Sequence, residues 1–144
     1  WGFAVETGTH AIRLLVSGVF DRFPRLKIVL GHMGENVPFH LWRTEHWFQR
    51  RPGAYPAKRP PMEVFRQNFW ITNSGVDHAP ALKYAIEVLG AERVLWAIDY
   101  PYEAMPPSVA FMNQVDISDE DRARIFHRNA EALFRIPPLP AQAA

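Results

Sequence analysis

Short apolar runs that alternate with helical stretches constrain the fold of this chain more than any other feature. The runs Ile28–Leu30, Phe69–Asn73 and Val94–Ile98 are apolar, β-branched or aromatic, which is typical of buried strands. The segments between them have apolar residues at helical spacing, so each strand leads through a helix to the next. This order predicts parallel strands joined by right-handed crossovers, which is an α/β fold.

The helical stretches have recognisable start signals and one unusual face. Helices are predicted over residues 6–20, 37–50, 62–68, 77–89, 106–115, 118–127 and 129–134. Thr7 or Thr9 is expected to cap the first of them, Ser118 the sixth and Asn129 the last. The aromatic residues of the helix over 37–50 fall on overlapping faces, which predicts a core position or a subunit contact for them.

Ionisable side chains follow two of the predicted strands directly. His32 and Glu35 come after the first strand, and Asp99 ends the third. Carboxyl ends of parallel strands meet at one edge of a sheet, where α/β folds build active sites. His32 can ligate a metal or exchange protons near neutral pH, and Glu35 can orient its imidazole. Asp99 can bind a divalent metal and move a proton.

Each of these residues also has a purely structural interpretation. His32 could bond to the backbone at a strand end, Glu35 could interact with a helix dipole, and Asp99 could be a turn residue. A zinc site takes at least three protein ligands as a rule, and the sequence contains no HxH, HExxH or cysteine pair. His10, alone on a helix, is interpreted as structural. The residues by themselves therefore indicate an α/β domain with an incomplete acid–base or metal site.

Composition excludes several classes of protein. The 144 residues suit one domain, and the net charge of +1 without a basic run argues against nucleic-acid binding. The absence of cysteine excludes disulfides and favours a reducing cytoplasm. No apolar run approaches the ~18 residues that a membrane helix needs. The apolar opening at Trp1, without a starting Met, predicts that the chain is an excised or incomplete part of a longer protein.

The number of strands leaves two architectures open. Three parallel strands fit a small open α/β sheet. They also fit the last part of an eight-stranded barrel whose first half lies outside the chain, because a closed barrel typically needs about 250 residues.

Several ordered motifs resemble the C-terminal half of the amidohydrolase-related decarboxylases, a family that includes the γ-resorcylate, 2,3-dihydroxybenzoate and 5-carboxyvanillate decarboxylases. The segments that match are Gly31–Glu35, Trp42–Arg43, Tyr55–Arg59, Ile71–Gly75 and Ile98–Glu103. The resemblance covers residues 1–136 and leaves 137–144 as a tail. It implies the C-terminal part of a metal-dependent-hydrolase-type (β/α)8 TIM barrel.

The resemblance also implies roles for individual residues. Asp99 matches the metal-binding aspartate that donates a proton to the ring carbon, and His32 matches the histidine beside the metal. Glu35 matches the glutamate that supports this histidine. Arg43 matches an arginine that binds the substrate carboxylate, in some members across a subunit interface. The implied cofactor is one divalent ion, zinc or manganese, and the implied assembly is a homodimer or homotetramer.

Two departures from the family pattern stand out. The first metal ligands of the family, an HxH or ExH pair on the first strand and a further histidine, have no counterpart here. The Asp-Trp-Pro-Phe-Glu motif common among resorcylate enzymes has tyrosine at two positions, Tyr100 and Tyr102. The added hydroxyl groups change the chemistry available to the substrate.

Three functional hypotheses follow. In the first, the parent protein is a metal-dependent, non-oxidative carboxy-lyase that removes CO2 from a small hydroxylated aromatic acid. In the second, it is a hydrolase of the same superfamily that cleaves an ester or lactone, with Asp99 as base. In the third, the fragment alone is an inactive half-barrel, which we expect to self-associate through exposed sheet edges.

Overall fold

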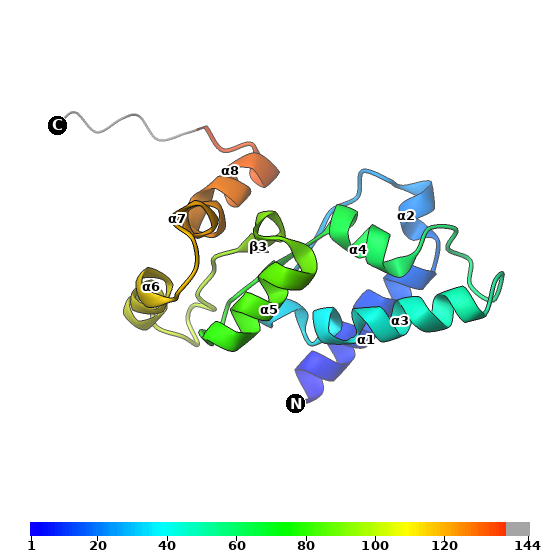
Figure 1. The fold of residues 1–144 in the computed structure, drawn as a ribbon, viewed down its shortest axis with the longest axis horizontal. Coiled ribbons are helices and arrows are strands. Elements are labelled where there is room, and N and C mark those ends of the chain that lie inside the picture. The colour runs from blue at the N-terminus through cyan, green and yellow to red at the C-terminus, as the bar shows by residue number, and fades with distance from the viewer. Residues whose placement is uncertain (138–144) are drawn as a thin grey trace.

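The computed structural model describes residues 1–137 and contains one parallel sheet flanked by helices (Figure 1). The strands are β1 (Ile28–Leu30), β2 (Phe69–Thr72) and β3 (Val94–Leu95), in that spatial order. Both strand pairs are parallel, with Val29 opposite Trp70 and Ile71 opposite Val94. The predicted α/β class and the parallel pairing are therefore confirmed.

The described helices agree with the sequence pattern in their approximate bounds, but there are eight α-helices where seven were predicted, because the stretch predicted as one helix over 6–20 is divided at Gly18. They are α1 (Gly2–Val16), α2 (Val19–Arg22), α3 (Val37–Arg50), α4 (Pro61–Asn68), α5 (Ala79–Leu89), α6 (Met105–Gln114), α7 (Asp119–Ala123) and α8 (Asn129–Phe134). Proline in the first turn of α3, α4, α5 and α6 favours these starts, because its missing N–H is not needed there. The prediction that Thr7 or Thr9 caps the first helix is wrong, since α1 begins at Gly2 and both threonines lie inside it.

The last helical segment is continuous where two separate helices were predicted. Ser118 caps α7 as predicted, because its hydroxyl oxygen accepts the Asp121 N–H at 3.1 Å. The predicted cap at Asn129 is wrong, since a π-helical stretch from Arg124 to Arg128 connects α7 with α8. The buried Asn129 amide instead donates to the Ala91 and Val94 carbonyls, at 2.7 and 2.8 Å. Asn129 thus attaches the last helix to β3.

The core lies where the helices cover the sheet. Ile71 on the central strand is fully buried, as are Val94 on β3 and Leu41 on α3. β3 is shorter than the predicted Val94–Ile98 because its later N–H groups bond elsewhere. Trp96 N–H donates to the Ile125 carbonyl at 2.9 Å, and Ala97 N–H donates to the Asn73 side chain at 3.1 Å.

The aromatic face of α3 is exposed within the described part of the chain. Phe39 and Trp42 are 71% and 67% exposed, so the core interpretation is wrong for these two side chains. Trp42 stacks on His46 of the same helix, with ring centroids 5.1 Å apart. The prediction of a subunit contact on this face stays open.

Two other predictions concern the chain as a whole. Within residues 1–137, every helix is too short or too polar to cross a lipid bilayer. Of the tail predicted over 137–144, only Pro137 belongs to the described residues.

We expect the isolated 144-residue chain to self-associate. In the described residues β1 and β3 each pair on one side only, and Trp1, Phe39 and Trp42 are exposed. Light scattering coupled to size exclusion is expected to give a mass above that of one chain. A Trp42→Lys variant separates the two causes, since it weakens association through the α3 face and leaves association through sheet edges intact. A monodisperse monomer at micromolar concentration would contradict the expectation.

Candidate active site

The ends of β1 and β3 place His32 and Asp99 in direct reach of each other. The two strands flank β2, and their carboxyl ends lie at the same edge of the sheet. His32 follows β1 after one residue, and Asp99 follows β3 on an extended segment with φ +81° at the aspartate. His32 Nε2 lies 3.5 Å from Asp99 Oδ2. The structure therefore brings together the two predicted strand tips.

Glu35 reaches the same histidine because the backbone after Gly31 forms a left-handed turn. His32, Met33 and Glu35 have φ values of 48°, 55° and 51°, and Gly34 has 76°. Residues three apart eclipse each other in a 3₁₀ turn, so side chains at positions 32 and 35 lie on one side. The result is a contact of 2.5 Å between His32 Nδ1 and Glu35 Oε1.

This turn is unfavourable by itself and is stabilised by its surroundings. An L-residue in the left-handed region costs roughly 1–2 kcal/mol. Backbone bonds from Gly34 N–H to the Gly31 carbonyl and from Glu35 N–H to the His32 carbonyl, 2.8 and 3.1 Å long, close the turn. Met33 and Gly34, which are part of the turn, are buried. Strained backbone of this kind, held by packing, is a common feature of functional sites.

The two carboxylates change the protonation of His32. The hydrogen bond with Glu35 raises the pKa of His32, partial burial opposes this, and Asp99 adds a smaller effect in the raising direction. Because Glu35 is buried and faces Nδ1, the histidine keeps a proton on Nδ1 and presents Nε2 to Asp99. His32 and Asp99 remain 43% and 33% exposed, which leaves both accessible to a ligand.

The accessible side of this pair opens into a cavity of about 540 Å³. Its lining combines aromatic rings with the three ionisable groups and consists of Trp1, Phe3, Ala4, His32, Glu35, Asp99 and Tyr102. Such a lining suits a small planar molecule with a polar substituent. Trp1 and Phe3 were not predicted to take part, because nothing in their local sequence indicates that α1 begins beside the strand tips.

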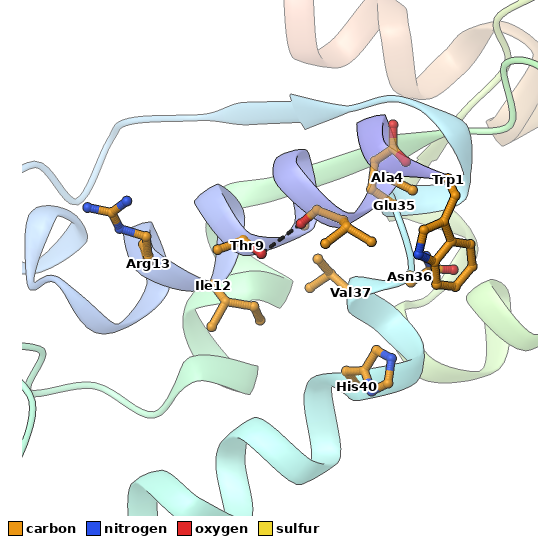
Figure 2. Close-up of a pocket in the computed structure, with 11 residues that line it drawn as sticks. Trp1, Ala4, Thr9, Ile12, Arg13, Glu35, Asn36, Val37 and His40 are labelled. Carbon is orange, nitrogen blue, oxygen red and sulfur yellow. Dashed lines mark hydrogen bonds between the residues drawn. The ribbon is translucent and has the colours of Figure 1, made fainter.

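A second cavity of about 380 Å³ lies between α1 and the start of α3 (Figure 2). It shares Trp1, Ala4 and Glu35 with the first cavity, but neither His32 nor Asp99 lines it. Its remaining walls are mainly apolar, with Val37 and Ile12 facing the space between the helices (Figure 2). We therefore place the candidate chemistry in the first cavity.

Arg43, the fourth predicted site residue, lies elsewhere. It is exposed on α3 and lines neither cavity. The described part of the chain makes no ion pair with it. The structure thus brings His32, Glu35 and Asp99 together and leaves Arg43 apart from them in a single chain.

The donor atoms of this cluster suit a divalent metal only as part of a larger ligand set. Imidazole nitrogen and carboxylate oxygen are common ligands of zinc, and carboxylate suits manganese. Among residues 1–137, however, no three His, Cys, Asp or Glu side chains converge as a metal site would require. The described residues can therefore supply Asp99, with His32 beside it, and further donors would have to come from other groups.

Two residues at the end of β2 were not singled out by the sequence pattern. Asn73 and Ser74 are buried between the His32 and Asp99 segments and bond to the backbone of both. The sequence does contain a signal for them. Two consecutive polar residues directly after a buried strand are expected to be hydrogen-bonded, because buried polar groups rarely lack a hydrogen-bond partner.

Comparison with known proteins gives a consistent result. The family model described as Amidohydrolase matches residues 1–136. The γ-resorcylate decarboxylase of Rhizobium sp. (strain MTP-10005) is 44% identical over 139 residues, which cover 94% of this chain and 42% of that protein. The chain thus spans about two fifths of the length of the curated relatives that it matches.

Solved structures agree with these matches. The 5-carboxyvanillate decarboxylase from Sphingomonas paucimobilis has 52% identity and a TM-score of 0.89, and the match covers 95% of this chain and 42% of that one. A dihydroxybenzoic acid decarboxylase from Polaromonas sp. JS666, solved with manganese and 2-nitroresorcinol, has 41% identity and a TM-score of 0.89 over 94% and 41% of the two chains. The expectation that the chain forms part of a (β/α)8 barrel is confirmed, and the small open sheet is not supported.

We expect Gly34→Ala to destabilise the protein more than Gly53→Ala. Both glycines have φ +76°, so both substitutions carry the cost of a left-handed backbone. A Cβ at position 34 would lie 2.8 Å from Ile71 Cγ2 and 3.0 Å from Pro38 Cδ, whereas nothing lies within 4 Å at position 53. We expect a loss of about 2–4 kcal/mol for Gly34→Ala and about 1–2 kcal/mol for Gly53→Ala. Urea denaturation of the full-length protein measures both, and equal losses would show that the packing beneath the turn is not tight.

Proposed function

This chain belongs to the amidohydrolase family, and on that premise we propose that the protein carrying it is a metal-dependent, non-oxidative decarboxylase of a small hydroxylated aromatic acid. The observation that supports this most is the His32–Glu35–Asp99 cluster facing an aromatic-lined cavity. Relatives that share more than 40% identity with the chain are named for decarboxylation of such acids. The proposal concerns the full-length protein, because the chain spans about two fifths of these relatives.

In this proposal Asp99 supplies the proton that replaces the carboxylate group. Its carboxylic acid protonates the ring carbon that bears the carboxylate. The bond from this carbon to the carboxylate then breaks, its electron pair restores the aromatic ring, and CO2 leaves. Proton delivery avoids a free aryl anion. His32 Nε2, 3.5 Å from Asp99 Oδ2, is placed to return a proton to Asp99.

Glu35 and the cavity wall prepare this step. The buried Glu35 carboxylate holds the His32 ring in one orientation and one tautomer. The rings of Trp1, Phe3 and Tyr102 bound the space in which a planar substrate would stack. Asp99 would help to hold a zinc or manganese ion, which would supply a positive charge that neutralises the acidic groups of the substrate.

The hydrolase alternative is not favoured, because these relatives with more than 40% identity are named as decarboxylases. Homologous decarboxylases have been solved with manganese. We propose one divalent ion for this protein as well, with zinc as the other candidate. A cytoplasmic location also stays a prediction.

We expect Asp99→Asn to abolish most CO2 release by the full-length protein. The amide cannot donate a proton of comparable acidity, and loss of a general acid typically costs on the order of 10²–10⁴ in rate. CO2 release is measured with 2,6-dihydroxybenzoate and 5-carboxyvanillate after loading with Mn²⁺ or Zn²⁺, with an ester and lactone panel alongside. Asp116→Asn is the matched control, because Asp116 is 97% exposed and, among residues 1–137, forms its ion pair with Lys83. Near wild-type rates in Asp99→Asn would refute the assigned role, and ester or lactone turnover without CO2 would refute the decarboxylase proposal.

We propose further that Arg43 binds the substrate carboxylate of a neighbouring subunit in a homodimer or homotetramer. The exposed position of Arg43 on the aromatic face of α3, away from its own cavity, is compatible with a contact between subunits. The planar guanidinium can form two parallel hydrogen bonds with a carboxylate.

Mixing two inactive variants tests this arrangement. Asp99→Asn and Arg43→Ala protomers are refolded or co-expressed together. If each site takes Asp99 from one subunit and Arg43 from its partner, hybrid dimers contain one intact site, and about a quarter of wild-type activity returns on random mixing. Activity no higher than that of the separate variants would place Arg43 and Asp99 in the same subunit's site or remove Arg43 from it.

A further inference from the structure

Asn73 and Ser74, at the end of the central strand, bond to the backbone on both sides of the site. Ser74 Oγ accepts the His32 N–H at 3.2 Å. Asn73 Oδ1 accepts the Ala97 N–H at 3.1 Å, two residues before Asp99. One dipeptide thus contacts the segment that carries the histidine and the segment that carries the aspartate.

We propose that Asn73 and Ser74 are positioning residues that set the separation of His32 and Asp99. The inference rests on the proposed function in so far as these two side chains act together in it. Neither Asn73 nor Ser74 lines the cavity, so they act through the residues that they hold.

Ser74 acts on the strained side of the site. β1 ends at Leu30, so within the described part of the chain the N–H of His32 has no strand partner, and the left-handed turn begins at this residue. The Ser74 side chain is buried, and its hydroxyl lies 2.7 Å from the Thr72 hydroxyl, which restricts its rotation. The hydroxyl oxygen therefore offers the His32 N–H an acceptor in one place, with little competition from water.

Asn73 acts on the opposite side, where β2 and β3 separate. The backbone N–H of Asn73 still donates to the Leu95 carbonyl at 3.2 Å, in continuation of the ladder. Two residues after Leu95, the Ala97 N–H donates to the side-chain carbonyl of Asn73 instead of to a backbone carbonyl of β2. This bond keeps the segment that leads to Asp99 beside β2 after the strand pairing has ended.

A part-buried network of hydrogen bonds determines the orientation of the Asn73 amide. Its Nδ2 donates to Asp77 Oδ1 at 2.8 Å, and the Ser108 hydroxyl donates to the same oxygen at 3.1 Å. Ser108 Oγ also accepts from Trp96 Nε1 at 3.1 Å. Because the carboxylate can only accept, the nitrogen of the fully buried Asn73 faces Asp77 and the oxygen faces Ala97.

Gly75, the next residue, shows how closely this segment approaches the reacting pair. A Cβ built on Gly75 would lie 3.4 Å from both Asp99 Oδ2 and His32 Cδ2. The backbone at Gly75 therefore lies close beneath the side chains of both His32 and Asp99. A shift of Asn73 or Ser74 would be transmitted to both.

The test compares Ser74→Ala, Ser74→Thr and the matched control Ser118→Ala in the full-length protein. Ser118 also accepts one backbone N–H through its hydroxyl, at 3.1 Å, but at the start of α7. Crystal structures measure the His32 Nε2 to Asp99 Oδ2 separation, and CO2 release gives kcat and KM. We expect Ser74→Ala to change this separation and to lower kcat by about 10- to 100-fold with KM within about twofold, since small misplacements have such effects. Ser74→Thr, which keeps the hydroxyl, and Ser118→Ala are expected to retain kcat.

A reciprocal exchange tests Asn73 without removing its volume. Asn73→Asp places two carboxylates against each other and is expected to lower kcat and the melting temperature. Adding Asp77→Asn restores one donor and one acceptor between positions 73 and 77. The double variant is expected to recover both kcat and the wild-type distance between His32 Nε2 and Asp99 Oδ2. This pair also keeps the inference testable if Ser74→Ala does not fold.

Several outcomes would overturn the inference. They are an unchanged separation and kcat in Ser74→Ala, an equal loss in Ser74→Thr, and no recovery in the double variant. Absence of CO2 release from the wild-type protein would instead refute the proposed function. The crystallographic separation would still decide whether Asn73 and Ser74 position the pair.

Discussion

The contact between His32 Nδ1 and Glu35 Oε1 determines how the rest of the site can work. It requires a left-handed backbone at residues that resist that conformation, and it requires a carboxylate buried where burial is costly. Each cost is offset by the other partner, because the imidazole compensates the buried charge and the carboxylate holds the turn closed. The contact leaves one histidine nitrogen, Nε2, free to face Asp99.

The central strand β2 connects the segment that carries His32 and Glu35 with the segment that carries Asp99. β2 contributes none of the three ionisable groups, yet its end contacts the segments that carry them through Ser74 and Asn73. A parallel sheet favours this division of roles, because neighbouring strands end at the same edge and the middle one lies within reach of both. The polar residues Asn73 and Ser74 after the buried middle strand therefore have a specific structural role. Their side chains replace backbone hydrogen bonds where the strands diverge.

Features set by local chemistry could be predicted from the sequence. The apolar run Ile28–Leu30, the amphipathic helix Val37–Arg50 and the serine cap at position 118 all formed as expected. The proximity of His32 and Asp99 followed from strand topology alone. The confirmed barrel family followed from the order of several motifs rather than from any single residue.

Features set by distant contacts could not be predicted in this way. The short β3 depends on where Ala97 and Trp96 find acceptors, and Asn129 joins β3 instead of capping a helix. The left-handed turn has sequence signals at His32, Gly34 and Asn36, residue types that accept positive φ, but nothing local favours positive φ at Met33 or Glu35. The exposure of Phe39 and Trp42 depends on which surfaces pack in the finished fold.

The bond between the Ser74 hydroxyl and the His32 backbone joins residues far apart in the chain, and this affects when chemical competence can appear during folding. Helices such as α3 can form from local interactions before any strands pair. The left-handed turn has two local backbone bonds, but its first residue, His32, lacks the Ser74 acceptor until β1 lies beside β2. A partly folded chain with its helices in place would therefore hold a misoriented imidazole and no working acid–base pair. The active arrangement of His32 and Asp99 therefore forms late in folding, after the sheet is complete. Incompletely folded molecules would have no catalytic activity.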